Sequence, residues 1–327
     1  MKKILLVAIP LLFSLTITLC SSTSGREGGG IGNEISDSEI RVLSKTKSVE
    51  IPKFVHFADE KVDLDRYDMH ERFDREINSF TYFHSTTLLL IKRANRYFPI
   101  IEPILKKNGI PDDFKYLAVI ESSLDPRAVS SARAAGLWQF LASTGKEFGL
   151  TVTPEVDERY HVEKATEAAC KYLKSAYAKY QNWASVALSY NGGQGRISGE
   201  LNKQQADEGL DLWLVEETAR YYFRMVAIKQ IFEHPYRYGF VLSANQLYKP
   251  IKFKDVTVSS TITDLATFAT DNGVTYAQLK DFNSWLRDRK LTVVGSKTYT
   301  IQIPTQESLY YSKEGVKVHN KAWVQHD

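Results

Sequence analysis

Apolar residues recur at intervals of three and four between residues 64 and about 245, which is the spacing of helices that bury one face. No stretch of this region alternates convincingly as a strand. Gly109 is expected to end one helix and Pro111 to open the next, which must stop before Pro126 because proline disfavours the helical conformation of its predecessor. The helices predicted in this way are 66–83, 86–109, 112–122, 161–180, 183–190 and 211–232.

The pattern changes after about residue 250. Residues 251–259 and 297–304 alternate like strands, and two short helical segments, 261–273 and 274–286, lie between them. The expected fold class is therefore mainly α, with a helical domain at 61–245 and a small strand–helix–helix–strand module at 250–305. Residues 306–327 form a polar tail to which the pattern assigns no structure.

The start of the chain has the features of a bacterial export signal. Two lysines precede an apolar run, residues 4–19, that is short for a membrane span. The run ends at Cys20, as in the lipobox of bacterial lipoproteins, whose lipidated cysteine becomes the first residue. Leu19 stands where a small residue is usual, so an ordinary cleaved signal with an incidental cysteine is the alternative. Residues 21–60 are rich in Ser, Gly and acids, which predicts a flexible tether.

The composition of the chain excludes some classes of function. A length of 327 residues suits two domains plus extensions, and 43% hydrophobic residues can supply their cores. The net charge of +3 is spread along the chain, so nucleic acid is not an expected partner. None of the seven histidines has a metal-ligand spacing, and no metal or cofactor is predicted. Cys170, the remaining cysteine, is expected to be a small buried hydrophobe.

Candidate chemistry gathers around Glu121, in the run YLAVIESSLDPRAVSSARAAGLWQF at residues 116–140. A single carboxylate ends an apolar helix and is followed by turn residues, small residues and an aromatic segment. Apolar neighbours keep a carboxyl protonated near neutral pH because burial disfavours its charged form. Asp125 lies four residues on, but a turn residue before Pro126 is its expected role. Taken alone, a Glu at a helix end is usually solvated.

Three segments in succession, residues 121–140, 189–197 and 216–231, resemble the motifs of lytic transglycosylases with a goose-lysozyme-like fold, and Trp138 in the first is typical of the D-type enzymes of that family. The resemblance covers roughly residues 90–240 and implies one catalytic acid, Glu121. It also implies residues that contact the substrate, namely Ser122, Gln139, Tyr190, Asn191 and Tyr221. Two further residues, Glu217 and Thr218, are implied to support the site.

The resemblance implies cleavage of the MurNAc–GlcNAc β-1,4 bond of peptidoglycan strands, with ring-closed 1,6-anhydro-MurNAc ends. Ordinary glycosidases need two carboxylates. In the family that the sequence resembles, the muramic acid N-acetyl group can stabilise the developing cation, and the sugar's own C6 hydroxyl replaces water as the nucleophile. A lysozyme-type hydrolase and a non-catalytic peptidoglycan-binding protein are the alternatives. The expected location is the cell envelope, anchored through lipidated Cys20, on the periplasmic face of the outer membrane.

Residues 254–304 resemble a LysM domain, a small module that binds glycans containing N-acetylglucosamine. The segment LATFATDNGVTYAQLKDFN, which includes Asn283, carries the resemblance. The usual opening Gly-Asp-Thr is replaced by residues 258–262. A module that binds sugar and one that only packs against the catalytic domain are both open.

Overall fold

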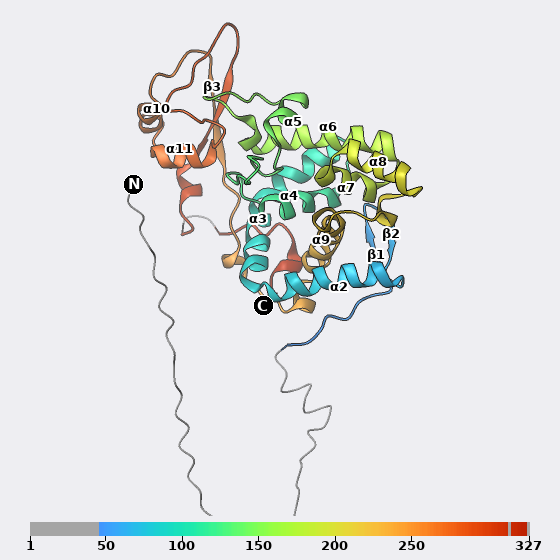
Figure 1. Ribbon diagram of the computed structural model, residues 1–327. Coiled ribbons are helices and arrows are strands. Elements are labelled where there is room, and N and C mark those ends of the chain that lie inside the picture. Colours follow the sequence, from blue (N-terminus) through green and yellow to red (C-terminus); the bar gives the residue numbers. More distant parts are fainter. Residues whose placement is uncertain (1–45, 313–314, 326–327) are drawn as a thin grey trace, which may run out of the picture. The chain divides into compact units, whose positions relative to one another are not determined.

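The periodic apolar segments form helices in the computed structural model, which describes residues 46–312 and 315–325 (Figure 1). The helices before residue 240 are α2 (Tyr67–Tyr82), α3 (His84–Lys107), α4 (Lys115–Ser122), α5 (Ala142–Glu147), α6 (Val162–Tyr180), α7 (Trp183–Gly192), α8 (Gln194–Gln204) and α9 (Glu216–Glu233). The predicted mainly α fold is confirmed. The signal peptide, Cys20 and most of the predicted tether lie outside the described residues.

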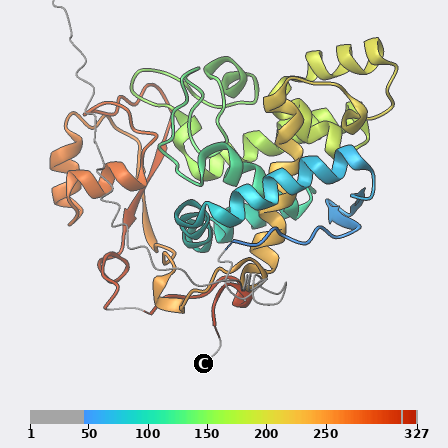
Figure 2. The same cartoon turned by 60° about the horizontal axis from the view of Figure 1, so that its bottom comes forward.

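Helix α9 is the centre of the helical domain. It packs against α2, α4 and α7, and Figure 2 shows α2 lying across it. Its buried residues, which run from Thr218 to Phe232, occupy every side of the helix rather than one stripe. A helix that is apolar all round is one that other elements enclose. The residues at its N-terminal end are therefore held rigidly beside α4 and α7.

The predicted strand–helix–helix–strand module is also present. Strand β3 (Phe253–Val258) pairs antiparallel with β4 (Tyr299–Pro304), so that Phe253 lies opposite Pro304. Between them lie α10 (Leu265–Asp271) and α11 (Tyr276–Phe282), and Figure 1 shows α10 and α11 gathered beside β3. Asp264 caps α10 through its side chain, and Thr275 opens α11 with a capping box. These caps explain why two such short helices form.

The tether was predicted for residues 21–60, but its last residues belong to the folded part of the chain. Strands β1 (Phe54–Phe57) and β2 (Glu60–Asp63) form an antiparallel hairpin that the alternation did not reveal. Val55, Phe57 and Val62 are buried in the main core. The strands are only four residues long, too short for a period of two to stand out in the sequence.

The polar tail predicted for residues 306–327 is likewise folded where it is described. Val316 and Val318 pack against the main core, and Trp323 is buried with its indole N–H donating to the carbonyl of Phe232 on α9. Buried Asn95 of α3 receives the backbone N–H of His319 and donates to the carbonyl of Lys317. The apolar residues of this segment are isolated in sequence, so no periodic pattern indicates their burial.

Helices α5 and α8 were not predicted, and α9 begins at Glu216 rather than at residue 211. Helix α8 buries only Ile197 and α5 only Gly145, so neither has an apolar stripe to read. Within the part of the chain that the structure describes, no helix has the length and apolar character needed to cross a membrane.

Docking of the C-terminal segment on α9 predicts a large stability effect. Replacing Trp323 by Ala should lower the free energy of unfolding by about 3–5 kcal/mol, because it removes a fully buried indole. Urea unfolding followed by circular dichroism measures the change. Trp213, which is 86% exposed, is the matched control, and its replacement by Ala should have little effect. Equal stabilities of the two variants would contradict the packing described here.

Candidate functional site

Glu121 reaches the cleft because α4 ends abruptly after it. The helix buries Leu117, Ala118, Val119 and Ile120 in succession, so the side chain that follows has apolar surroundings. Ser123 and Leu124 then adopt left-handed conformations, with φ of 55° and 54°. Such conformations are costly for residues other than glycine, at ~1–3 kcal/mol each, and persist only where packing fixes them. Leu124 is fully buried, which supplies that packing.

Burial raises the pKa of Glu121 to about 7, from a model-compound value of 4.5. The hydroxyl of Tyr221 donates a hydrogen bond of 2.5 Å to Oε1 of Glu121. This bond and the charge of Arg224 lower the pKa, but burial, to which the negative charge of Glu217 adds, outweighs both of them. At neutral pH the carboxyl is therefore protonated in a substantial fraction of molecules, as the apolar sequence around it predicted.

A polar network beside the acid joins α7 to α9. The Thr218 hydroxyl, on a buried side chain, donates to Oδ1 of Asn191 at 2.8 Å. The Asn191 amide in turn faces the carboxylate of Glu217, with Nδ2 and Oε1 3.5 Å apart. Glu217 and Tyr221 lie four residues apart, so they share one face of α9. This face presents the acid's hydrogen-bond donor and a negative charge to the same region.

Tyr190 of α7 and Gln139, in the segment before α5, complete the set. The Tyr190 hydroxyl donates to the carbonyl of Trp138, and its ring lies edge-on to Tyr172 at 5.0 Å. Trp138 is itself fixed, because its buried indole donates to the Thr166 hydroxyl. Gln139 adopts a left-handed conformation with φ of 48°, and its amide donates to the carbonyl of Gly136. The hydroxyl of Tyr190 thus serves the fold, and its ring forms the wall.

An open cleft of about 690 Å³ brings most of these residues together. Of the residues predicted for the site, those that line it are Glu121, Gln139, Tyr190, Asn191 and Glu217. Tyr221 and Thr218 lie behind this surface and contact it through Glu121 and Asn191. Among the described residues, no group of three or more His, Cys, Asp or Glu side chains is placed to hold a metal ion.

Ser122 is placed differently from the prediction. Its side chain is buried, its hydroxyl donates to the carbonyl of Ala118 one turn earlier, and it is not among the residues that line the cleft. This geometry gives it a role in ending α4 rather than in contacting a ligand. The turn role predicted for Asp125 is confirmed, since its carboxylate accepts the backbone N–H of Arg127.

Sequence reasoning missed the far side of the cleft. The residues that line it there come from α5, α6, α8 and the segments that follow α5 and precede α8, and they are Thr144, Glu147, Phe148, Tyr172, Ser175, Gly193 and Gln194. Neither α5 nor α8 was predicted, so no pattern placed their residues at a site. Gly193, between α7 and α8, has a positive φ of 83°, a conformation that favours glycine.

The fold and the cleft define a lysozyme-like helical domain followed by a LysM-like module. Residues 98–212 match the family described as the transglycosylase SLT domain, and residues 254–307 match the soluble lytic transglycosylase C-terminal LysM-like domain. The chain therefore contains a transglycosylase SLT domain and a C-terminal LysM-like domain.

Similar proteins carry related names. Membrane-bound lytic murein transglycosylase D of Escherichia coli strain K12 is 30% identical over 230 residues, which cover 69% of this chain and 49% of that protein. Membrane-bound lytic murein transglycosylase C of Yersinia enterocolitica is 29% identical over 162 residues, or 43% of each chain. The solved structure of the 70-kDa soluble lytic transglycosylase of Escherichia coli matches 51% of this chain and 30% of that chain. The sequence identity is 16% and the TM-score is 0.39. The chain spans about half the length of the first of these relatives.

The raised pKa of Glu121 predicts how stability depends on pH. A carboxyl that holds its proton more tightly when folded stabilises the protein below the unfolded pKa, 4.5, and this stabilisation is lost as the pH rises to the folded value of about 7. The wild type should therefore lose on the order of 1–3 kcal/mol more than Glu121→Gln over this interval. Urea unfolding of both proteins below and above the interval tests this. Parallel pH profiles would show that the pKa of Glu121 is not raised.

Proposed function

We propose that this protein is a peptidoglycan lytic transglycosylase that cleaves the MurNAc–GlcNAc β-1,4 bond and leaves 1,6-anhydro-MurNAc ends. The observation that carries the proposal is the state of Glu121, a buried carboxyl with a pKa of about 7, facing an open cleft and held by the hydroxyl of Tyr221. Such a group can both donate and accept a proton near neutral pH. The family membership and the names of the relatives point to the same substrate.

In the proposed reaction, protonated Glu121 donates its proton to the glycosidic oxygen as the bond to C1 of MurNAc breaks. The GlcNAc part leaves with a free 4-hydroxyl group. The N-acetyl group of MurNAc stabilises the positive charge that develops at C1. The carboxylate of Glu121 then takes the proton of the C6 hydroxyl, whose oxygen closes the ring on C1. The second step is intramolecular, so it needs orientation and one proton acceptor.

The other site residues take positioning roles in this proposal. Thr218 fixes the amide of Asn191. One of the two N–H bonds of that amide faces Glu217, and the other is available to bind the N-acetyl carbonyl. The ring of Tyr190 and the side chain of Gln139 line the cleft and limit the position of the sugar. Tyr221 holds the carboxyl of Glu121 in place and is not itself in the cleft. Ser122 is assigned no contact with the substrate, because its hydroxyl faces back into α4.

A lysozyme-type hydrolase remains the alternative, and the cleft itself favours keeping it. Glu147 and Glu217 line the same cleft as Glu121, so further carboxylates are present although no sequence motif indicated them as catalytic. Glu217 lies near enough to raise the pKa of Glu121, but its contact with Asn191 and its place on α9 give it a supporting role. A non-catalytic binding protein would have no use for a carboxyl kept protonated at neutral pH.

Products decide between the two enzymes. Digestion of purified murein should yield fragments ending in 1,6-anhydro-MurNAc, which borohydride leaves unreduced and which mass spectrometry finds one water lighter than hydrolysis products. Glu121→Gln should lower the rate by about 10²–10⁴, because the amide cannot transfer a proton. Glu217→Gln, which keeps Glu121, is the matched control and should retain the anhydro product. Reducible ends from the wild type would identify a hydrolase, and normal turnover by Glu121→Gln would remove its catalytic role.

We also propose that the protein is anchored in the cell envelope by lipid on Cys20, on the periplasmic face of the outer membrane. The domains proposed are a signal at 1–20, a tether from residue 21 to about 47, a catalytic domain at 48–245 and a LysM-like domain at 250–305. In this division residues 306–312 and 315–325 complete the fold rather than extend from it. The apolar run before Cys20 and the Ser- and Gly-rich segment after it support the anchor.

The anchor predicts that Cys20→Ser moves the protein from the membrane fraction to the soluble fraction. One acyl chain binds a membrane only marginally, so firm attachment requires several chains on this residue. Cell fractionation and the mass of the mature N-terminus measure the outcome. The matched control is Cys170→Ser, which should stay in the membrane fraction. A Cys20→Ser protein that remains membrane-bound would contradict the lipid anchor.

A further inference from the structure

The hydrophobic core of the LysM-like module includes residues of the helical domain, one of which belongs to a segment that lines the cleft. The second apolar cluster of the structure contains Leu265, Leu279 and Ile301 of the module together with Ala135, Val156 and Tyr160 of the helical domain. Ala135 belongs to residues 128–141, called here the cleft wall, which carries Gln139. Because a core of this kind is close-packed, displacement of one contributor disturbs the others.

Arg159 supports the cleft wall from behind. Its guanidinium donates to the carbonyls of Arg133 and Phe140, each at 3.0 Å, and forms a buried ion pair with Asp157 at 2.7 Å. Gly136 packs so closely on the backbone of Arg159 that an added Cβ would lie 1.8 Å from its carbonyl oxygen. The position of the wall is therefore set by residue 159 and its neighbours.

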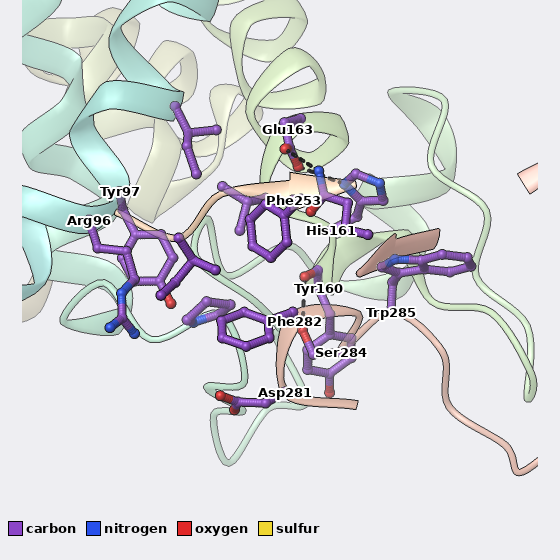
Figure 3. Close-up of a pocket in the computed structure, with 15 residues that line it drawn as sticks. Arg96, Tyr97, Tyr160, His161, Glu163, Phe253, Asp281, Phe282, Ser284 and Trp285 are labelled. Atoms are coloured by element: carbon purple, nitrogen blue, oxygen red, sulfur yellow. Dashed lines mark hydrogen bonds and ion pairs between the residues drawn. The ribbon is translucent and has the colours of Figure 1, made fainter. Parts of the chain in front are cut away.

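The segment that carries Arg159, residues 153–163, is held in turn by the module. Backbone hydrogen bonds run from Asp157 N–H to the carbonyl of Trp285 and from Arg287 N–H to the carbonyl of Glu155, each within 2.9 Å. The Ser284 hydroxyl donates to the carbonyl of Tyr160, as Figure 3 shows. The Glu155 carboxylate accepts the backbone N–H and the hydroxyl of Thr292 and pairs with Lys290.

Side chains of the module also pack against those of residues 153–163. The guanidinium of Arg287 lies over the ring of Tyr160, 4.2 Å from its centroid, and Trp285 stacks on His161. The cavity in Figure 3, between Arg96 and Tyr97 of α3 on one side and Phe282 and Trp285 on the other, has a volume of about 50 Å³. That is space for one or two waters and not for a sugar. This cavity is therefore part of a packed interface and is too small to hold a glycan.

We propose that the LysM-like module is a positioning element of the catalytic site, which acts through residues 153–163 and Arg159 on the cleft wall. The proposal rests on the proposed glycan-cleaving function. It differs from a module that raises the local concentration of enzyme on the wall and otherwise leaves the reaction unchanged. Arg159 is a positioning residue, since it fixes the wall that bears Gln139 and does not itself line the cleft.

The physical need for this support lies in the conformation of the wall. Arg133 and Gln139 both have left-handed backbones, with φ of 61° and 48°. Strained conformations persist only where the surroundings over-determine them. The two carbonyls bound by Arg159 are those of Arg133 and of Phe140, which follows Gln139. The support is thus applied at the strained positions.

Glu155→Ala tests the proposal in the full-length protein. It removes the carboxylate contacts to Thr292 and Lys290 and changes neither the module's core nor the cleft. Asp271→Ala removes an exposed carboxylate from α10 and is the matched control. Glu155→Ala should lower kcat on soluble, uncross-linked glycan strands by roughly tenfold, since misplacement by 1 Å can cost up to ~10²-fold. Its binding to insoluble murein, measured with Glu121→Gln also present to prevent turnover, should match that of the control.

Arg159→Lys gives an independent reading. Lysine retains the charge that neutralises Asp157, but its single nitrogen cannot replace a guanidinium whose Nη1 donates to both carbonyls while Nε and Nη2 donate to Asp157. Amide hydrogen exchange of residues 128–141 should accelerate in Arg159→Lys and in Glu155→Ala, while exchange in α9 stays slow and circular dichroism stays unchanged. The Asp271→Ala control should match the wild type in all of these measurements.

The outcomes separate the two hypotheses. If kcat and the exchange of the cleft wall were unchanged in Glu155→Ala while murein binding was weaker, the positioning role would be overturned. The module would then act by raising the local concentration of the enzyme on murein. Slow wall exchange in the wild type and faster exchange in both variants would support positioning even if the wild type cleaved no glycan. In that case the failure would belong to the proposed function alone, because exchange does not depend on catalysis.

Discussion

The burial of one carboxyl group is the constraint on which the rest of this structure depends. Glu121 has a pKa near 7 because desolvation outweighs the hydrogen bond from Tyr221 and the charge of Arg224. Desolvation at the rim of an open cleft requires apolar packing on every side that does not face the cleft. The wholly apolar turns of α4, the enclosed helix α9 and the left-handed exit through Leu124 supply that packing. Each of these features is costly alone and is retained because the others hold it.

The need for an open cleft also explains the irregular backbone of the cleft wall. A cleft that admits a glycan strand needs a wall without protruding helix side chains, and residues 128–141 provide it with small residues and turns. The segment has backbone hydrogen bonds within itself, such as that from Ala135 N–H to the carbonyl of Phe140, but its left-handed residues also need the packing of the elements behind it. Arg159, the close approach of Gly136 and the module's core provide that support from elements distant in sequence.

The sequence predicted the parts of the structure that rest on local pattern. The long helices, the βααβ module and the place of Glu121 at a helix end followed from apolar spacing, caps and proline positions. It failed where burial depends on isolated residues brought together by the fold. Trp323 and the hairpin around Phe57 have no periodic neighbours, and α5 and α8 have too few buried residues to form a stripe. The support of the wall by Arg159 was beyond sequence reasoning for the same reason, since its partners Arg133 and Phe140 contribute backbone carbonyls.

Electrostatics couples substrate binding to the proton in the proposed reaction. Glu217 carries a negative charge that raises the pKa of Glu121, and the same carboxylate faces the amide of Asn191. A sugar N-acetyl group bound to that amide excludes water from the carboxylate as well as from Glu121. Loss of solvent screening strengthens the repulsion between the two carboxyl groups, because Coulomb energies grow as the local dielectric falls. Binding therefore favours protonated Glu121, the form required for the first step. When the bond has broken, the positive charge at C1 offsets this repulsion and allows Glu121 to remain ionised until it takes the next proton.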